Sequence, residues 1–481
     1  MLKTKIICTI GPSTFSYEKL RALVEAGMDV ARLNMSHGTL DSHKKIISLV
    51  RELSLELGKP LAILLDLPGP RLRIGNFSAG FVRLQDGEEF TLTADQVDGD
   101  ASRVSINYPD LVDEVSAGDE IHLADGTIKL GVSEVKGSDI RCKVLTGGIL
   151  HSGKGMNIPG KRLNIPAITK KDIEGIGFGA ENKVDFVALS FVQTDADLKK
   201  ARELLTEKGS QAGLVAKIER KIAIKNLKRI LRASDGVMVA RGDLGVETGF
   251  ENIPLLQKQI IRACNMAGKP VITATQMLVS MVTNPNPTRA EVSDIANAVI
   301  DGTDALMLSE ETAVGMYPVE AVKVMVRVAR NAERSLPYAR ILTERREALK
   351  RTMAGIISYS ACQIAMDINA KAMVVPTRSG LSAYRVSMCR PSQPIIALVR
   401  NETLQRRLLL SWGVRPYLLD THLPGEVLPP TVERLLVREV PPQGPQHVVI
   451  VYGGLKTKVG STNSINVQII GRKSQSPHLK G

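Results

Sequence analysis

Two short segments carry side chains whose types and spacing are suited to catalysis with a divalent metal ion. Lys217 and Glu219 lie two residues apart, so a β-strand would place both on the same face. Arg241 and Asp243 follow an apolar run, where a strand would end and a helix would begin. Two carboxylates at neighbouring strand ends can hold Mg²⁺, and a lysine beside the ion can stabilise an enolate or a phosphoryl group in transfer. The backbone N–H groups near Gly242 and Asp243 could bind a substrate carboxylate at the helix N-terminus.

The elements expected around these segments are those of a barrel. Short β-branched apolar runs alternate with amphipathic stretches, and eight runs are predicted strands: 5–10, 30–34, 62–67, 186–191, 214–218, 236–240, 270–275 and 305–308. Eight strand–helix units are typical of a (β/α)₈ TIM barrel, an α/β fold whose active sites lie past the C-terminal ends of the strands. A salt bridge at the rim of such a barrel would explain Lys217 and Glu219 alone, but both segments together favour a catalytic site.

Two further regions depart from this alternation of strands and helices. Residues 70–155 are rich in Gly, Asp and alternating apolar patterns, which predicts a small β domain inserted in a barrel loop. From residue 334 a third segment begins with a helix near 356–368 and continues with strands near 372–375, 394–399 and 447–451. We therefore predict a catalytic barrel of residues 1–69 and 156–333, the inserted domain, and a C-terminal α/β domain of residues 334–481.

The composition is that of a soluble globular protein, with 481 residues of which 43% are hydrophobic and 23% are charged. No segment is long enough for a membrane span, and the first apolar run is too short for a signal peptide, so we expect a cytoplasmic protein. The five cysteines are far apart, which disfavours a zinc site or a disulfide framework.

The net charge of +13 is located in the last third of the chain, where 21 Lys and Arg accompany 8 Asp and Glu from Arg334 onwards. This excess indicates either a solvated basic surface or contact with a polyanion, a phosphorylated ligand or an acidic partner subunit. Nucleic acid is disfavoured as a partner because aromatic residues make up only 4% and the sequence has no nucleic-acid-binding motif.

Both chemical segments resemble those of pyruvate kinases. The similarity continues through residues 32–38, 65–67, 269–278, 287–294 and 301–304, and it extends over roughly residues 3 to 470. It implies Mg²⁺-dependent phosphoryl transfer from phosphoenolpyruvate to ADP, the last step of glycolysis, by a homotetramer. It also implies that the inserted domain is a small β-barrel lid that excludes water, and that the C-terminal domain serves effector binding and oligomerisation.

The resemblance implies a role for each residue of the site. Glu219 and Asp243 would ligate Mg²⁺, and a second Mg²⁺ would arrive with ADP. Lys217 would offset charge on the phosphoryl group and the enolate, while Arg32 would hold the phosphate. Thr275 and Ser309 would belong to the polar network that protonates the enolate. The implied substrate-binding set is Arg32, Lys217, Ala240, Arg241, Gly242, Asp243 and Thr275, and the nucleotide set is His37 and Arg73. A structural role is equally well supported for His37.

Two positions depart from the family pattern. Potassium-dependent relatives have Glu where this chain has Arg71, and the positions that would surround K⁺ are Asn34, Ser36, Asp66 and the carbonyl group of Leu67. A fixed guanidinium could supply the positive charge of that ion, so our hypothesis is that the protein is potassium-independent. Glu310 replaces a family glycine, and it either perturbs the proton network beside Ser309 or points away from it.

The C-terminal domain contains a further resemblance, to the effector phosphate loop of the family. The matching residues are Thr377, Arg378, Ser379, Gly380 and Ser382. Their hydroxyl and N–H groups suit an anion, although a plain strand–turn–helix is the structural alternative. The late stretch 453–463 lacks the Trp-Arg pair of many relatives activated by fructose bisphosphate, which favours a sugar monophosphate or AMP as effector. Two other functions remain open: a lyase acting on phosphoenolpyruvate or a 2-oxo acid, and an inactive relative that senses a phosphorylated metabolite.

Overall fold

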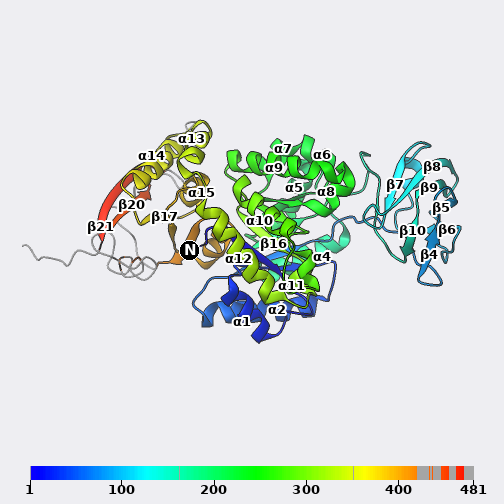
Figure 1. Ribbon diagram of the computed structural model, residues 1–481, viewed down its shortest axis with the longest axis horizontal. Helices are drawn as coiled ribbons and strands as arrows, with labels where there is room; N and C mark the ends of the chain where they lie inside the picture. The colour runs from blue at the N-terminus through cyan, green and yellow to red at the C-terminus, as the bar shows by residue number, and fades with distance from the viewer. Residues whose placement is uncertain are drawn as a thin grey trace, which may run out of the picture.

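The computed structural model describes residues 2–161, 163–349, 352–419, 433, 436, 446–453 and 462–470. Figure 1 shows three parts in a row, with the barrel in the middle, the inserted domain at one end and the C-terminal domain at the other. Among the residues described, no helix is long and apolar enough to cross a membrane.

Eight parallel strands close the central barrel in the order β1-β16-β15-β14-β13-β12-β3-β2. They are β1 (Lys5–Thr9), β2 (Val30–Asn34), β3 (Ala62–Asp66), β12 (Phe186–Leu189), β13 (Gly213–Ile218), β14 (Gly236–Ala240), β15 (Val271–Ala274) and β16 (Ala305–Leu308). The barrel prediction and its eight strands are confirmed, with ends that differ from the predicted ones by at most two residues. Two predicted strands run too far because Phe191 (φ +54°) and Thr275 (φ +63°) adopt left-handed backbone, which cannot continue a strand.

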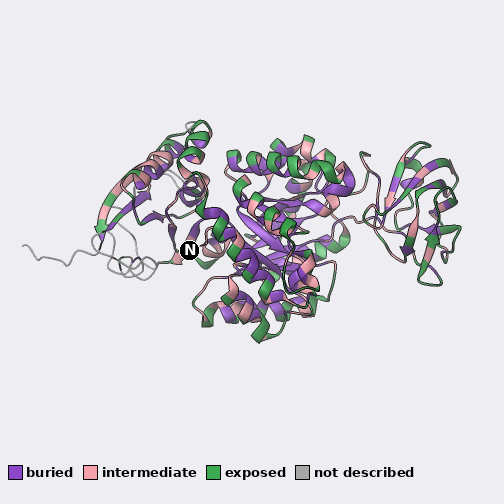
Figure 2. Ribbon diagram, in the orientation of Figure 1, coloured by how far each residue is buried: buried purple, intermediate pink, exposed green. Residues whose placement is uncertain are grey.

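The barrel is surrounded by helices and short 3₁₀ turns that connect its strands. These are α1 (Tyr17–Ala26), α2 (Leu40–Glu56), α4 (Lys170–Glu181), α5 (Asp195–Glu207), α6 (Lys221–Lys225), α7 (Leu227–Ala233), α8 (Arg241–Thr248), η1 (Phe250–Asn252), α9 (Ile253–Ala267), η2 (Val279–Val282), α10 (Arg289–Asp301), α11 (Glu310–Ala313) and α12 (Pro318–Arg334). Thr39, Thr169 and Thr288 each begin a helix with a reciprocal capping box. Strand side chains alternate between two cores, so Ile7 lies inside the barrel and Ile6 packs against the helices. Figure 2 shows the resulting pattern of buried strands beneath helices with exposed outer faces.

The inserted domain has its own sheets and core. Its elements are β4 (Phe81–Leu84), β5 (Glu89–Thr93), β6 (Arg103–Ser105), α3 (Leu111–Glu114), β7 (Glu120–Leu123), β8 (Ile128–Lys136), β9 (Asp139–Thr146), β10 (Gly148–His151) and β11 (Met156–Asn157). The strands of the predicted β-barrel pair as a six-stranded sheet, β11-β7-β8-β9-β5-β6, and a two-stranded sheet, β10-β4. Because β11 pairs with β7, and Ile158 and Leu163 pack in the same core, we propose a domain boundary several residues after the predicted position 155.

The C-terminal domain is a five-stranded sheet with helices. Its elements are α13 (Tyr338–Leu349), α14 (Met353–Asp367), β17 (Ala372–Pro376), α15 (Leu381–Met388), β18 (Ile395–Val399), α16 (Glu402–Leu408), β19 (Val414–Leu418), β20 (Gln446–Tyr452) and β21 (Ser464–Ile470). The order is β19-β18-β17-β20-β21, with β21 antiparallel to β20. Arg406 Nε lies 2.7 Å from Asp185 Oδ1, and Arg390 Nη2 lies 3.0 Å from Asp304 Oδ1. Since Asp185 and Asp304 directly precede β12 and β16, these ion pairs fix the C-terminal domain to the N-terminal end of the barrel.

Candidate active site

Four charged side chains meet at the C-terminal ends of β2, β3 and β13. Arg32 donates to Asp66 Oδ2 through Nε at 2.8 Å and contacts the same oxygen through Nη2 at 2.7 Å. Lys217 Nζ lies 3.2 Å from Asp66 Oδ1 and 3.0 Å from Glu219 Oε1. Arg32, Asp66 and Glu219 are buried, and the Lys217 side chain is only 12% exposed. The predicted phosphate-binding, charge-stabilising and metal-binding residues are therefore brought together in one desolvated network, where electrostatic contacts are stronger than in water.

The ionisation of this network follows from its geometry. Burial alone would lower the pKa of Lys217, but the charges of Asp66 and Glu219 outweigh it, and the pKa of Lys217 is raised. Burial alone would raise the pKa of Asp66, but Lys217 and Arg32 hold the pKa of that carboxyl below its usual value. Burial raises the pKa of Glu219, and the charge of Asp243 adds to this effect while Lys217 opposes it. Lys217 therefore keeps its positive charge at neutral pH, as stabilisation of a phosphoryl group requires.

The loop after β12 completes the network with two residues that sequence reasoning missed. Lys217 Nζ donates to Ser190 Oγ at 2.7 Å, and Ser190 Oγ donates to the carbonyl oxygen of Leu67 at 2.7 Å. The backbone N–H of Phe191 donates to Glu219 Oε2 at 2.6 Å, and it is aimed there by the left-handed backbone of Phe191. The one available signal was that both residues end a predicted strand, where barrels carry their functional groups.

Glu219 and Asp243 form a carboxylate pair that fits a divalent cation. Asp243 lies in the first turn of α8, and its charge acts on both Glu219 and Lys217. Glu219 is buried, and burial is the main cause that raises its pKa, with the charge of Asp243 adding to the shift. Hard cations such as Mg²⁺ bind oxygen ligands of this kind. Within the described ranges there is no group of three or more His, Cys, Asp or Glu that could hold a metal ion. A pair of carboxylates leaves coordination positions for substrate oxygens and water, which is how Mg²⁺ is usually held.

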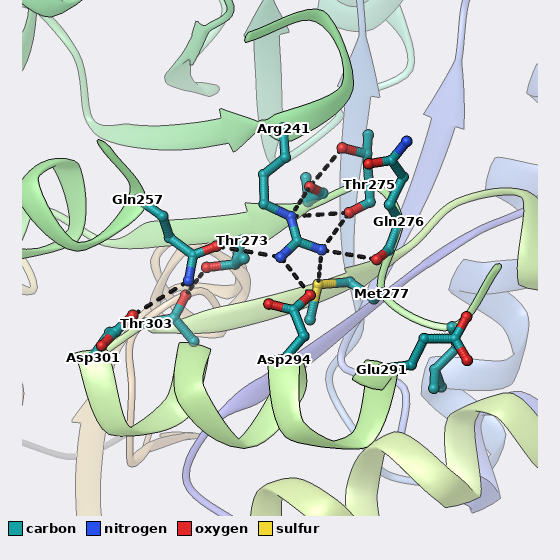
Figure 3. A network of polar contacts seen from close by, with 12 residues as sticks. Arg241, Gln257, Thr273, Thr275, Gln276, Met277, Glu291, Asp294, Asp301 and Thr303 are labelled. Atoms are coloured by element: carbon teal, nitrogen blue, oxygen red, sulfur yellow. Dashed lines mark hydrogen bonds and ion pairs between the residues drawn. The ribbon is translucent and has the colours of Figure 1, made fainter. Parts of the chain in front are cut away.

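Arg241 organises the turn that follows β15 (Figure 3). Its Nε and Nη2 donate to the carbonyl oxygen of Thr275 at 3.1 and 2.6 Å, and Nη2 also donates to that of Gln276 at 3.0 Å. Its Nη1 forms a 2.5 Å ion pair with Asp294 of α10. Thr275 (φ +63°) and Gln276 (φ +55°) both have left-handed backbone, so one guanidinium holds two strained residues in place. The Arg241 side chain is thus engaged within the protein, and we assign it a positioning role beside the predicted substrate-binding backbone.

Two hydroxyl groups lie at neighbouring strand ends beside this turn. The N–H of Gly242 donates to Thr275 Oγ1 at 3.0 Å, and that hydroxyl donates to the carbonyl oxygen of Ala274 at 2.7 Å. Ser309 Oγ is buried and has no hydrogen-bond partner among the described residues, although the N–H of Ser309 donates to Glu311 Oε2 at 2.6 Å. A buried hydroxyl without a partner is costly, so we expect Ser309 to bind a water molecule or substrate.

The two departures from the family pattern lie outside the buried network. The Arg71 guanidinium is half-exposed and lies 3.5 Å from Asp125 of the inserted domain. Glu310 is exposed, which supports the alternative in which its carboxylate points away from Ser309.

The residues predicted to surround a monovalent cation lie near one another. Asn34 and Asp66 are register partners of β2 and β3, and Asn34 Oδ1 accepts the N–H of Ser36 at 3.1 Å. The carbonyl oxygen of Leu67 already accepts the Ser190 hydroxyl. Asp66 is held by two cationic side chains, so positive charge is present at this place without an added ion.

The two residues predicted to contact the nucleotide are His37, at the rim of the barrel, and Arg73, at the start of the inserted domain. His37 is exposed, and its carbonyl oxygen lies 2.9 Å from Nε2 of the buried His43. Arg73 Nη1 donates to the carbonyl oxygen of Gly153 at 2.7 Å. Their contact with a nucleotide stays a prediction.

The predicted effector loop joins β17 to α15. Thr377 Oγ1 accepts the N–H of Gly380 at 2.9 Å, and Gly380 has left-handed backbone (φ +82°). Ser382 Oγ lies 2.6 Å from Thr462 Oγ1. Arg378 is exposed and Ser379 is half-buried. Most of the late stretch used to choose between effectors, residues 454–461, lies outside the described residues.

Comparison with known proteins identifies relatives of both the barrel and the C-terminal domain. The family model described as "Pyruvate kinase, barrel domain" matches residues 1–322, and "Pyruvate kinase, alpha/beta domain" matches residues 356–468. The chain is 45% identical over 475 residues to a pyruvate kinase of Geobacillus stearothermophilus, which covers 97% of this chain and 80% of the relative. It is 41% identical over 474 residues to a pyruvate kinase of Clostridium acetobutylicum, and this match covers 98% of this chain and 100% of the relative. Its fold is similar to that in the crystal structure of a pyruvate kinase from Cryptosporidium parvum, with a TM-score of 0.92 and 38% sequence identity. The match covers 97% of this chain and 96% of that chain.

Proposed function

The chain belongs to the pyruvate kinase family and is a phosphotransferase, and we propose that its barrel site transfers the phosphoryl group of phosphoenolpyruvate to ADP. The observation that carries this proposal is the buried network of Arg32, Asp66, Lys217 and Glu219. It combines a planar donor suited to phosphate, a lysine that is charged at neutral pH and a carboxylate suited to a metal ion. These groups lie at the end of the barrel where TIM-barrel enzymes have their active sites.

Arg32 and Lys217 bind and stabilise the phosphoryl group in this proposal. Three of the five Arg32 N–H groups are used by Asp66 and Thr9, which leaves donors for phosphate oxygens. An ADP oxygen attacks the phosphorus in line, the bond from phosphorus to the enol oxygen breaks, and Lys217 offsets the charge on both sides of the transfer. Glu219 and Asp243 would hold Mg²⁺, which supplies a Lewis acid toward the substrate oxygens, and a second Mg²⁺ would arrive with ADP.

Proton delivery completes the reaction, because enolpyruvate must take a proton on carbon to become pyruvate. We assign this step to the polar network of Thr275 and Ser309. The Ser309 hydroxyl supports the assignment, since it is buried without a partner and can hold the water or substrate atom that passes the proton.

The inserted domain is proposed to close over the site and exclude water. Gly69 lies where the chain leaves the barrel and has left-handed backbone (φ +65°). A Cβ at this position would lie 2.9 Å from atoms of Ser190 and Phe191, so only glycine allows the connection to pass this close to the site. Closure would prevent transfer of the phosphoryl group to water.

Regulation and cation dependence are part of the same proposal. We propose that the protein works without K⁺, and the support is the pair of cations at Asp66 together with Arg71 in place of a family glutamate. Activation by a phosphorylated metabolite through the loop around Thr377 and assembly as a homotetramer are proposals that rest on the resemblance to the family. A cytoplasmic location is a proposal that rests on the sequence features given above.

The direct test is ATP formation from phosphoenolpyruvate, ADP and Mg²⁺ by the wild-type protein and by Lys217→Met. We expect robust activity in the wild type and a loss of at least about a hundredfold in the variant, because one charge in the transition state is removed. Pyruvate formation without ATP would favour a lyase, and a folded wild-type protein that binds phosphometabolites without turnover would favour a sensor.

A further inference from the structure

Two chain segments join the barrel to the inserted domain, and the packing of their residues shows where each segment passes from one body to the other. On the outgoing segment, Leu67 packs in the barrel core and Leu72 packs in the core of the inserted domain. On the returning segment, Ile165 packs against the core of the inserted domain and Ile168 packs against the barrel core. A change of orientation between two packed bodies is taken up where their packing ends. The residues in between, which belong to neither core and which we call the hinge, are 68–71 and 166–167.

One buried carboxylate is bonded to both segments. Asp172 lies in the first turn of α4 and is 0% exposed. Its Oδ1 accepts the N–H of Gly69, in the outgoing part of the hinge, at 3.0 Å. Its Oδ2 accepts the N–H and the hydroxyl group of Thr169, just after the returning part of the hinge, at 2.7 and 2.6 Å. A single side chain therefore joins the two segments, although Gly69 and Asp172 are 103 positions apart in the sequence.

The bond to Gly69 serves no purpose for helix α4 itself. Asp197 has the same position in α5, where its Oδ2 accepts the N–H groups of Gln193 and Thr194 at 2.8 Å, and it is half-buried. Such a capping carboxylate needs one oxygen to begin a helix. Asp172 caps α4 with Oδ2 and turns its other oxygen to the hinge. Removing a carboxylate from water is costly unless both oxygens are hydrogen-bonded, so the full burial of Asp172 is explained by the hinge and not by the cap.

The hinge is also in contact with the catalytic network. A Cβ at Gly69 would lie 2.9 Å from the Cβ of Ser190 and from Cδ2 of Phe191, so the backbone of Gly69 lies directly against both residues. The Ser190 hydroxyl accepts a hydrogen bond from Lys217 Nζ, and the N–H of Phe191 donates to Glu219 Oε2. A displacement of the hinge backbone would therefore displace the groups that hold the proposed charge-stabilising lysine and the proposed metal-binding carboxylate.

We propose that Asp172 is a positioning residue for phosphoryl transfer, which clamps both hinge segments to the barrel so that the inserted domain closes over the site in one orientation. The inference rests on the proposed closure of that domain. Two segments that share one anchor allow the domain to rotate but prevent one segment from sliding past the other. Asp172 acts through the backbone of Gly69 and Thr169 and does not touch the substrate. Its contribution is to keep the reacting groups in the geometry that transfer requires.

The test measures the orientation of the inserted domain by electron paramagnetic resonance. Spin labels are attached to Lys143→Cys on β9 and Glu207→Cys at the end of α5, both at exposed positions. The five native cysteines are buried, so the labels react with the introduced ones. The distance distribution is recorded with and without phosphoenolpyruvate and Mg²⁺, in the absence of ADP so that no turnover occurs. We expect the distribution of this labelled reference protein to become narrow when the ligands are added.

Asp172→Asn in the labelled protein should leave the distribution broad with ligands present. The amide keeps one oxygen but its nitrogen cannot accept from Thr169, so one of the two segments is released. Without the labels, the same substitution should lower kcat/KM for phosphoenolpyruvate about tenfold, because the reacting groups are held less well. Asp197→Asn is the matched control, since it changes the same group at the same helix position away from the hinge. It should keep the narrow distribution.

A milder pair of variants tests the clamp even where Asp172→Asn does not fold. Thr169→Val removes the hydroxyl that donates to Asp172 Oδ2 and should also broaden the distribution, whereas Thr194→Val at the start of α5 should not. The proposal is overturned if Thr169→Val and any folded Asp172→Asn protein keep the narrow distribution. It is also overturned if the control variants broaden the distribution equally, or if the ligands do not narrow it in the reference protein. Failure of the proposed function is a different result, namely no ATP formation by the wild type.

Discussion

Arg241 Nη2 donates to the carbonyl oxygen of Thr275 at 2.6 Å, so a buried guanidinium fixes the turn that carries one of the predicted proton-transfer hydroxyls. The same guanidinium reaches Asp294 on α10, which joins the ends of β14 and β15 to a helix of the outer layer. We therefore propose that Arg241, a predicted substrate-binding residue, acts by holding Thr275 in a backbone conformation that threonine rarely adopts.

Arg241→Lys should lower kcat about tenfold or more and destabilise the protein by about 2–4 kcal/mol, because a lysine cannot replace the planar fork of donors. The KM for phosphoenolpyruvate should change less than kcat if the effect acts through Thr275. Steady-state kinetics and urea unfolding measure the two effects. Arg262→Lys, on an exposed position of α9, is the matched control and should change neither.

Ser309→Ala should lower kcat about tenfold or more while leaving the free energy of unfolding unchanged or slightly raised. The reason is that the Ser309 hydroxyl is buried without a partner, so its removal ends a desolvation cost but deletes a group of the proton network. Exchange of the pyruvate methyl protons with solvent would measure the proton-transfer step, and thermal melts would measure the stability. A destabilised variant with normal turnover would contradict the assignment.

Glu219→Gln should abolish the rise in melting temperature that Mg²⁺ causes in the wild type. The reason is mass action, since an ion that binds only the folded state stabilises it, and one of the two proposed carboxylate ligands is lost. Thermal melts across a Mg²⁺ titration measure this without reference to turnover. Glu310→Gln removes an exposed carboxylate a short distance from Ser309 and should retain the full Mg²⁺ effect.

Arg71→Glu should create a K⁺ requirement that the wild type lacks. The substitution replaces a positive charge by the negative one that potassium-dependent relatives carry at this position, and an added monovalent cation would restore the balance. The measurement is activity in K⁺ buffer against activity in a buffer with a large organic cation. Asp125→Asn removes the carboxylate that lies 3.5 Å from Arg71 and leaves the positive charge of Arg71 in place. This variant should therefore stay active without K⁺. If Arg71→Glu is equally active in both buffers, the hypothesis is wrong.

Acidification should destabilise the protein through His43. Burial lowers the pKa of this imidazole below the ordinary value near 6.5, and Nδ1 is buried with no partner among the described residues. Between the lowered pKa and about 6.5 the unfolded chain binds a proton that the folded chain does not, so stability falls as pH falls through this window.

His43→Gln should flatten this pH dependence, because an amide can donate to the His37 carbonyl oxygen without taking up a proton. Melting temperature against pH is the measurement. His151→Gln, at an exposed position of the inserted domain, is the control and should follow the wild-type curve. A curve for His43→Gln that parallels the wild type would show that another group carries the acid sensitivity.

Sequence alone predicted the barrel, which the structure confirms, and the catalytic set, which stays a prediction, because both depend on local patterns. The eight β-branched runs reappear as the eight barrel strands, and Lys217 of β13 contacts Glu219, which follows the strand directly, as their spacing of two residues suggests. Polar residues that follow such strands must gather at one end of the barrel, since the strands are parallel. The long ordered similarity to pyruvate kinases then implied the chemistry without any knowledge of contacts.

Only the tertiary structure decided what depends on residues distant in sequence. Ser190 and the N–H of Phe191 join the network because the loop after β12 turns into left-handed backbone, which no strand pattern announces. The guanidinium of Arg241 turns to carbonyl groups some thirty residues later, and that of Arg71 reaches the inserted domain. In each case the strength of the contact depends on burial and on the orientation of donor and acceptor groups, which the spacing of residues along the chain does not specify.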